Sequence, residues 1–375
     1  MDLLEIRNQL DQIDAQIISL YEQRMELCKE VANFKIETGK AVFDKEREQQ
    51  KIRSVKALAH GAFHQQAAEE IFTQLMTISR RYQYQLLEQH GKSMETGFRI
   101  VPSLPLKGSK IVYQGVEGAY SHAAALQYFG IEADVYHVRT WEEAMNDVER
   151  GAADYAVIPI ENSSAGAVID NYDALIKHSN VIVAETFLTV NHALLGVPGA
   201  DISDIGTVYS HPQALMQCSE FLNQHPQWRQ ISVENTAVAA QKVLADQDPK
   251  QAAIASEDAG RRYGLAVLQS TINHNKENMT RFLILTRERI YTQTADKISI
   301  CFELPHRSGS LYNMLGNFIY NGVNLMMIES RPILGKNWEY RFFVDIEGNL
   351  SDSSIQNALK SISEEAANLQ ILGNY

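Results

Sequence analysis

A single arginine interrupts the hydrophobic face of the first long helix that the sequence predicts. Apolar residues recur at alternating steps of three and four, the spacing of one helix face, and Arg24 occupies the position missing from that series. A cation there is unfavourable unless an anion meets it. Lys35 follows 11 residues later, nearly in phase and about 16 Å along the axis, so the two side chains could bind a small dianion. An internal ion pair, or an arginine that reaches water, is the simpler alternative. The apolar positions are Ile6, Leu10, Ile13, Ile17, Leu20, Leu27, Val31 and Phe34.

Arg7 raises a geometric question. It lies 17 residues before Arg24 on the same predicted helix, roughly 25 Å away, so both cannot reach one small ligand within a single chain. Either Arg7 is a plain surface residue, or a second protomer running antiparallel supplies it to the site. We expect the second arrangement.

Further polar residues of the first 90 positions share helix faces at spacings of three and four, although each pairing alone is usually a solvated face. The segments "LEIRNQLDQID", "EQRMEL", "KEVANFK", "FDKEREQ" and "IFTQLMTISRRYQ" resemble the helical class of chorismate mutases. The resemblance implies that arginines bind the two carboxylates of chorismate, that a lysine and a glutamine bind its ether oxygen, and that three further residues orient the ring hydroxyl and the second helix. In that order, the residues are Arg7, Arg24 and Arg47; Lys35 and Gln83; and Asp44, Glu48 and Ser79.

This chemistry suits a site built from side chains alone. A Claisen rearrangement needs no general acid, base or cofactor. It needs a compact conformer of a flexible dianion and hydrogen-bond donors at the oxygen that gains negative charge.

Four segments of the central region carry hydroxyl and amide groups where we expect strands to lead into helices. They are "YQGVEGAYSHAA", "VIPIENSSAG", "YSHPQALMQC" and "MTRF". Helix N-termini at such turns present backbone N–H groups to anions. Gly115 and Gly118 permit a tight turn, with Ser121 placed to cap the next helix and Ser210 to cap another. The simpler interpretation of each turn is an ordinary N-cap.

The four segments together resemble prephenate dehydratase over residues 110–286. The resemblance implies a bilobal fold like that of type II periplasmic binding proteins, with prephenate in the cleft. Thr280 is then the acid or hydrogen-bond donor that helps the ring hydroxyl leave, and either Arg281 or backbone N–H groups hold a carboxylate. We interpret three histidines near these motifs, His122, His192 and His211, as structural. The residues implied to position prephenate are Asn162, Ser163, Ser210 and Gln217.

The C-terminal region contains "HRSGSLYNML" and "NLMMIESRPILGKNWEYRFFVDIEG", which resemble an ACT regulatory domain of the phenylalanine-responsive kind. The resemblance implies an effector site where backbone N–H groups at a helix start meet the carboxylate of L-phenylalanine. A dimerisation module that binds nothing is the alternative. Ser308, Ser310 and Met326 depart from the usual pattern. The implied effector residues are Gly309, Ser310 and Leu311 at the helix start, and Glu329, Ser330 and Arg331 at a strand end.

Composition narrows the function further. The 375 residues carry 34 basic and 46 acidic side chains, a net charge of −12, and no long basic run, so nucleic acid and anionic membranes are not expected partners. No signal-peptide pattern and no run of 18 apolar residues occurs, so we expect a cytoplasmic protein. Neither a cofactor nor a metal is expected, because the sequence has no dinucleotide, P-loop or metalloprotease motif. The isolated Cys28, Cys218 and Cys301 lack metal-ligand spacing and are interpreted as reduced packing residues.

The elements that must position these residues fall into three predicted domains. Residues 1–90 form helices near 3–38, 44–59 and 64–89, and a helix about 50 Å long cannot bury its seam in so small a monomer, so we expect an intertwined dimer. Residues 91–108 are a linker. Residues 109–286 alternate strand and helix, which indicates an α/β domain of two lobes with largely parallel sheets. Residues 297–375 have the order βαββαβ, an α+β sandwich.

Over its whole length the chain resembles the bifunctional chorismate mutase–prephenate dehydratases of phenylalanine biosynthesis. That resemblance implies chorismate and prephenate as substrates, L-phenylalanine as effector, and a homodimer or higher homo-oligomer. A mutase fused to prephenate dehydrogenase would need a glycine-rich dinucleotide turn, which is absent. A cytoplasmic amino-acid sensor with a vestigial mutase domain is the rival from another class, and the intact cationic positions argue against it.

Overall fold

The structure is a computed structural model that describes residues 2–91, 94–333, 335–336 and 338–375. The chain forms two compact units, Met1–Thr96 with Asp296–Ile371, and Gly97–Ala295 with Leu372–Tyr375. Of the predicted linker, residues 92–93 lie outside the described part. None of the described helices is long and apolar enough to cross a membrane.

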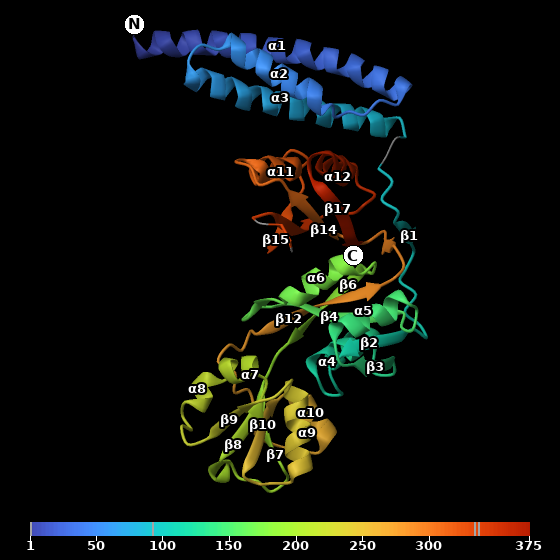
Figure 1. The fold of residues 1–375 in the computed structure, drawn as a ribbon, viewed down its shortest axis with the longest axis vertical. Helices are drawn as coiled ribbons and strands as arrows, with labels where there is room; N and C mark the ends of the chain where they lie inside the picture. The colour runs from blue at the N-terminus through green and yellow to red at the C-terminus, as the bar shows by residue number, and fades with distance from the viewer. Residues whose placement is uncertain (1, 92–93, 334, 337) are drawn as a thin grey trace. The chain divides into compact units, whose positions relative to one another are not determined.

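The first unit begins with three helices that lie lengthwise beside one another (Figure 1). Their bounds agree with the predicted ones to within two residues. Gly39, at a φ of 70°, ends the first helix in the left-handed region that glycine tolerates best. Asp44 caps the second by accepting from the Arg47 backbone N–H at 3.0 Å. The helices are α1 (Leu3–Thr38), α2 (Lys45–Leu58) and α3 (Ala62–Gln89).

The apolar face of α1 stays exposed in the single chain. The sequence predicts this exposure, because a helix of this length cannot bury its apolar face in so small a monomer. Ala32 is the one buried residue of α1, whereas Leu20 is 64% exposed and Leu27 69% exposed. A continuous apolar face of this length is unfavourable in water. Its remaining large members, from Ile6 to Phe34, are exposed as well.

The same unit holds the C-terminal elements in the predicted order of strand, helix, two strands, helix and strand. The strand order is β15-β16-β14-β17, and both helices lie on one side of the sheet (Figure 1). Met314, Phe318 and Leu359 are buried on the helices. The elements are β14 (Lys297–Leu304), α11 (Ser310–Ile319), β15 (Leu325–Pro332), β16 (Tyr340–Glu347), α12 (Ser353–Glu365) and β17 (Ala367–Asn374), the last of which runs beyond the residues of this unit.

The second unit has two α/β lobes. In the first lobe the strand order is β6-β12-β4-β2-β3, with α4 packed on one face and α5 and α6 on the other. The strands β1 (Arg99–Val101) and β13 (Ile290–Thr292) form a short parallel pair, so the segment of chain that enters this unit lies beside the segment that leaves it. The other elements are β2 (Lys110–Gln114), α4 (Tyr120–Phe129), β3 (Asp134–Val138), α5 (Trp141–Glu149), β4 (Tyr155–Asn162), β5 (Gly166–Ala167), α6 (Ile169–Lys177), β6 (Val181–Thr189) and β12 (Met279–Thr286).

The second lobe is also a sheet between two helical layers (Figure 1). Alternate residues of each strand point to opposite faces, so Leu195 packs with α9 and α10 while Leu194 packs with α7 and α8. The strand order is β11-β7-β10-β8-β9. The elements are β7 (Ala193–Gly196), the 3-10 helix η1 (Ile202–Asp204), β8 (Thr207–Ser210), α7 (Pro212–Gln217), α8 (Ser219–Leu222), β9 (Arg229–Ser232), α9 (Thr236–Asp246), β10 (Gln251–Ala255), α10 (Glu257–Tyr263) and β11 (Ala266–Gln269).

Two antiparallel segments, residues 190–192 and 270–278, join the lobes, and the Val190 N–H donates to the Asn278 carbonyl at 2.8 Å. After the second lobe, the chain returns to the first lobe through residues 270–278 and continues as β12. This strand therefore starts at the cleft and runs antiparallel to both β4 and β6. The expectation of largely parallel sheets is wrong here. As a consequence the start of β12 lies beside the end of β4, with Thr280 opposite Asn162.

Candidate active sites

The two cations of the helical face both turn toward α3. The Arg24 guanidinium donates to the Leu75 carbonyl at 3.3 Å and to the Ser79 hydroxyl. Lys35 donates from Nζ to Gln83 Oε1 at 3.1 Å. Ser79 and Gln83 are four residues apart on α3, so the four side chains lie along one stretch of the interface between α1 and α3, as their helical phase predicts, and this stretch is called the groove below.

Among the described residues, Lys35 and Gln83 each keep one donor hydrogen without an acceptor. The ammonium has three hydrogens, and two are used, on Gln83 Oε1 and on the Val42 carbonyl at 2.7 Å. The Gln83 amide donates one of its two hydrogens to the Ser79 carbonyl at 3.2 Å. Burial lowers the pKa of Lys35 from its ordinary value, although the Asp44, Glu364 and Glu48 carboxylates partly offset this. The groove can therefore direct two donors at one oxygen.

Asp44, Arg47 and Glu48, which the sequence predicts on one face of the second helix, have three different environments. Asp44 caps α2, and both carboxylate oxygens of Glu48 accept from Arg80 Nη1 at 2.6 and 2.5 Å. Arg80, which the sequence reasoning missed, is 7% exposed and also pairs with Glu365 at 2.5 Å. A signal was present, because a carboxylate turned toward a helix interface requires a cationic partner.

Arg7 and Arg47 are exposed and make no side-chain ion pair within the described residues. Since α1 is one continuous helix, Arg7 stays roughly 25 Å from Arg24 and cannot join its groove in the same chain.

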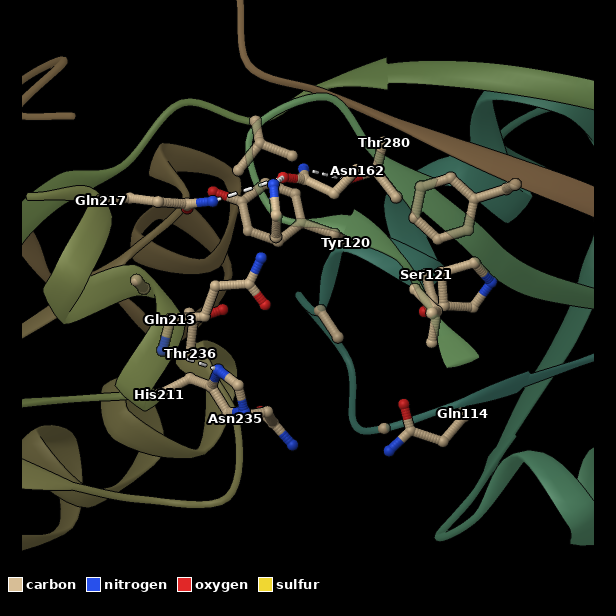
Figure 2. A pocket seen from close by; sticks show the side chains of 18 of the residues that line it. Gln114, Tyr120, Ser121, Asn162, His211, Gln213, Gln217, Asn235, Thr236 and Thr280 are labelled. Atoms are coloured by element: carbon tan, nitrogen blue, oxygen red, sulfur yellow. Dashed lines mark hydrogen bonds between the residues drawn. The ribbon is translucent and has the colours of Figure 1, made fainter. Parts of the chain in front are cut away.

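A cavity of about 490 Å³ lies between the two lobes of the second unit. Figure 2 shows Gln114 and Ser121 of the first lobe on one wall and Gln213 and Asn235 of the second lobe on the other. Asn162, Gln217 and Thr280 line it, as predicted, and all three are at most 9% exposed.

The other three residues implied for prephenate do not line this cavity. The Ser210 hydroxyl is fully buried and donates to the Ile254 carbonyl at 2.6 Å. Ser163 accepts from the Met279 N–H at 2.9 Å. Arg281 points to the opposite face of β12 from Thr280, as neighbouring strand residues do, and pairs with Glu185 at 2.6 Å.

Two predicted caps are also wrong. Ala119 precedes α4 and Ser121 lies inside it, so α4 begins without a side-chain cap. His211, rather than Ser210, caps α7, because its Nδ1 accepts from the Gln213 N–H at 3.3 Å. "MTRF" begins β12 instead of following a strand.

Asn162 connects the cavity groups. Its Oδ1 accepts from the backbone N–H groups of Ser164 and Ala165 at 3.1 and 3.0 Å, which fixes the orientation of the amide. Its Nδ2 consequently donates to Thr280 Oγ1 at 2.9 Å. Within the described residues Thr280 has no acceptor for its own hydroxyl hydrogen, so the hydroxyl can donate into the cavity.

Backbone N–H groups, rather than cationic side chains, are what this cavity offers an anion, and one carboxylate, Glu234, also lines it. No lysine or arginine is found among its described lining residues. The first turns of α4 and α9 open onto it, and helix N-termini attract negative charge through their backbone N–H groups. Sequence reasoning missed the lining residues Gln114, Tyr120, Trp141, Gln213, Asn235 and Thr236, and it assigned no site role to His192 or His211.

The residues implied for an effector lie at two places in the C-terminal sandwich. Gly309, at a φ of 81°, precedes α11, with Ser310 and Leu311 as its first residues. Glu329, Ser330 and Arg331 lie near the end of β15, which is the edge strand of the sandwich. No group of three metal-ligating side chains occurs in the described parts of the chain.

Comparison with known proteins matches two family models, Chorismate mutase type II over residues 6–84 and Prephenate dehydratase over residues 111–290. The bifunctional chorismate mutase/prephenate dehydratase of Escherichia coli K12 is 35% identical over 382 residues, which covers 100% of this chain and 96% of that protein. Its Aquifex aeolicus counterpart is 31% identical and covers 100% and 98%. The crystal structure of prephenate dehydratase from Arthrobacter aurescens in complex with L-Phe has a TM-score of 0.66 and 31% identity, and the match covers 71% of this chain and 89% of that chain.

Proposed function

This chain belongs to the bifunctional chorismate mutase/prephenate dehydratases, and from that membership we propose how its residues divide the work. The enzyme rearranges chorismate to prephenate and then converts prephenate to phenylpyruvate, with loss of carbon dioxide and water. The two steps belong to phenylalanine biosynthesis. Neither a sensor with a vestigial mutase nor a fusion to prephenate dehydrogenase is favoured.

In the mutase groove, Arg24 and Arg47 bind the carboxylates of chorismate, and Arg7 of a second copy completes the clasp. Lys35 and Gln83 place their remaining hydrogens on the ether oxygen, which gains negative charge as its C–O bond breaks. Asp44 and Glu48 set the second helix and the ring hydroxyl, with Ser79 holding Arg24.

The exposed apolar face of α1 is the reason to propose a second copy of the chain. An antiparallel partner would cover the apolar residues from Ile6 to Phe34 and bring its own Arg7 to the groove. An intertwined homodimer therefore buries the face and completes the site with one interface.

In the cleft, the N-termini of α4 and α9 hold the carboxylates of prephenate, and Gln217 and Asn162 surround the leaving hydroxyl with Thr280. Since Arg281 is paired with Glu185, backbone N–H groups are the better carboxylate ligands of the two alternatives. The bond between the ring and the departing carboxylate breaks, its electron pair enters the ring and makes it aromatic, and the hydroxyl oxygen leaves with the electron pair of the C–O bond. Thr280 donates the hydrogen bond along which the departing oxygen gains a proton and becomes water, and the hydroxyl regains its proton from solvent.

The Asn162–Thr280 hydrogen bond is the observation that carries this assignment, because it occupies one lone pair of the threonine oxygen and leaves the hydroxyl hydrogen to donate toward the cavity. Thr280→Ala is expected to lower phenylpyruvate formation by about 10³-fold or more, within the usual range for acid catalysis. Thr280→Ser keeps the hydroxyl and serves as the matched control. Chorismate consumption in the same samples should be unchanged. A dehydratase rate for Thr280→Ala within threefold of wild type removes Thr280 from the mechanism.

For regulation, we infer that L-phenylalanine inhibits the dehydratase by binding at the start of α11, where a carboxylate meets backbone N–H groups. Glu329 is the acceptor for its ammonium, and Leu311 supplies an apolar wall. The Arthrobacter aurescens relative with L-Phe bound supports the choice of ligand.

A further inference from the structure

His192 is a buried histidine that the mechanism above does not use. It lies in the segment 190–192 that joins the two lobes, and it is 2% exposed. Its Nε2 is 3.0 Å from Gln217 Oε1, and its Nδ1 is 3.0 Å from the Tyr120 hydroxyl. The imidazole thus lies between a residue of α4 and one of α7, on opposite sides of the cleft.

The direction of these hydrogen bonds can be derived from the backbone. Two backbone N–H groups hold Asn162 Oδ1 as an acceptor, so the Gln217 group 3.4 Å from it must be the NH₂. Gln217 Oε1 then faces His192, and Nε2 of that ring must carry a proton to donate. Burial lowers the pKa of His192, which favours the neutral ring, here as the Nε2–H tautomer. The single hydrogen of the Tyr120 hydroxyl then lies between two acceptors, the Asn191 carbonyl at 2.8 Å and Nδ1 of His192 at 3.0 Å.

This arrangement leaves one Gln217 amide hydrogen without an acceptor in the described part of the chain. Its Oε1 is occupied by His192 and one N–H by Asn162 Oδ1, so the second N–H is available to the cavity that Gln217 lines. The Thr280 hydroxyl is available in the same way, because Asn162 donates to it. Two donors therefore face the cavity, and the orientation of one of them depends on His192.

The main chain at His192 is held separately from its ring. Its N–H donates to Asn273 Oδ1 at 3.0 Å, and its carbonyl accepts from the Ile272 N–H at 2.8 Å. Substitution of the side chain therefore leaves the joining segment anchored at both groups.

We propose that His192 is a positioning residue of the dehydratase site, which donates from Nε2 to Gln217 and so keeps the amide N–H of Gln217 aimed at the leaving hydroxyl of prephenate. The proposal rests on the role proposed above for this cleft. We expect a loss of about tenfold to a hundredfold in activity, the range that outer hydrogen-bond partners of metal ligands show when they are removed. The effect belongs in kcat, because the donor matters most as charge develops on the departing oxygen.

The test compares His192→Leu, which has no donor, with His192→Gln, whose amide can donate from a similar position. Steady-state kinetics with prephenate on the full-length enzyme should show kcat reduced at least tenfold in His192→Leu, with KM within threefold of wild type. His192→Gln should recover to within about threefold in kcat. His178→Leu removes another buried histidine of the same unit, one that pairs with Glu149, and is expected to change stability but not kcat.

A double-mutant cycle with Gln217→Ala separates positioning from packing. If His192 acts through Gln217, His192→Leu should cost less than threefold on the Gln217→Ala background. The proposal is overturned if His192→Leu keeps kcat within threefold of wild type, if His192→Gln loses as much as His192→Leu, or if the two costs multiply in the cycle. Should His192→Leu fail to fold, His192→Gln alone decides: a kcat reduced tenfold or more overturns the proposal, and a kcat within about threefold of wild type supports it. Thr280→Ala in parallel distinguishes the failures, since an active Thr280→Ala enzyme contradicts the site itself.

Discussion

The mutase groove and the dehydratase cleft, the sites proposed for two isomeric dianions, present opposite sets of groups. The groove directs Arg24 and Lys35, both half-buried, from one helix toward another. The cleft has no lysine or arginine among its described lining residues and offers amides, hydroxyls and helix N-termini beside one carboxylate, Glu234. Substrate charge alone therefore does not decide which groups an enzyme uses to bind it.

The two reactions account for the difference. The rearrangement keeps both carboxylates, so cations that hold them lose nothing as the transition state forms, and they compress a flexible molecule. In the dehydratase one carboxylate leaves as neutral carbon dioxide. A cation paired with that group would stabilise the ground state more than the transition state and would slow the reaction. Backbone N–H groups bind the anion without an equally strong attachment.

In the proposed mutase site, one chain lacks the arginine that Arg7 of a second copy would supply. Hybrid dimers test this proposal with the largest expected effect. Arg7→Ala and Arg24→Ala should each lower mutase activity by about 150-fold or more, from a loss of at least ~3 kcal/mol per buried ion pair. A mixture of the two variants should regain part of the activity, because each hybrid dimer has one groove with both arginines. Dehydratase activity in the same mixture is the control. No recovery after verified subunit exchange contradicts the shared site.

Regulation should reach the cleft but not the groove if L-phenylalanine acts as proposed. An allosteric coupling of roughly 1–3 kcal/mol corresponds to about 5–150-fold inhibition of the dehydratase. Glu329→Ala removes the ammonium acceptor and should abolish inhibition while leaving both basal activities intact. Calorimetry on the full-length protein that detects no phenylalanine binding at millimolar concentration ends this idea. Removal of residues 287–375 would be a poorer test, because Ile290 of β13 belongs to the core of the first lobe.

The cationic groove was more predictable from sequence than the cleft, for a physical reason. Helical phase places Arg24 and Lys35 on one face of α1. Their hydrogen-bond partners are four residues apart on α3, so spacing along the chain is enough to predict that these side chains meet. The cleft gathers residues through long-range topology. Thr280 reaches Asn162 only because β12 enters antiparallel to β4, which strand propensity does not reveal.

Strand alternation was the signal that could have corrected the cleft. Thr280 and Arg281 are adjacent on one strand, so only one of them can face the cavity. His192 offered no such signal, since it lies in a joining segment without periodicity and meets Gln217 across 25 positions of sequence.

The pH dependence should distinguish the two sites in a single sample. Burial lowers the pKa of Lys35, so its ammonium is present below that pKa and is lost as pH rises through it. Mutase activity should therefore fall on the alkaline side below the ordinary lysine value of 10.5, by about tenfold per pH unit beyond the pKa. Gln83 is neutral at every pH in this range and therefore adds no second transition to the pH–activity profile. A mutase profile that stays flat up to that ordinary value contradicts the role of Lys35, provided the protein remains folded by circular dichroism.

The smallest expected effect, the response to salt, tests the comparison itself. Charges that solvent reaches are screened over about 10 Å at 0.1 M salt and about 3 Å at 1 M. Arg24 and Lys35 are half-buried and Arg47 is exposed, so salt should weaken their hold on chorismate. Raising sodium chloride from about 0.05 to 0.5 M should increase KM for chorismate roughly threefold to tenfold.

The cleft should respond less, because its donors are fixed dipoles in contact with the ligand rather than mobile side-chain charges. KM for prephenate is expected to change by less than about twofold over the same range, since screening acts weakly on short-range dipolar contacts within a buried site. Arg47→Gln, which removes an exposed cation, should reduce the salt response of the mutase and leave that of the dehydratase unchanged. Equal salt responses at the two sites would mean that net charge steers both substrates alike, and the contrast between a cationic groove and a cation-free cleft would then have no consequence for binding.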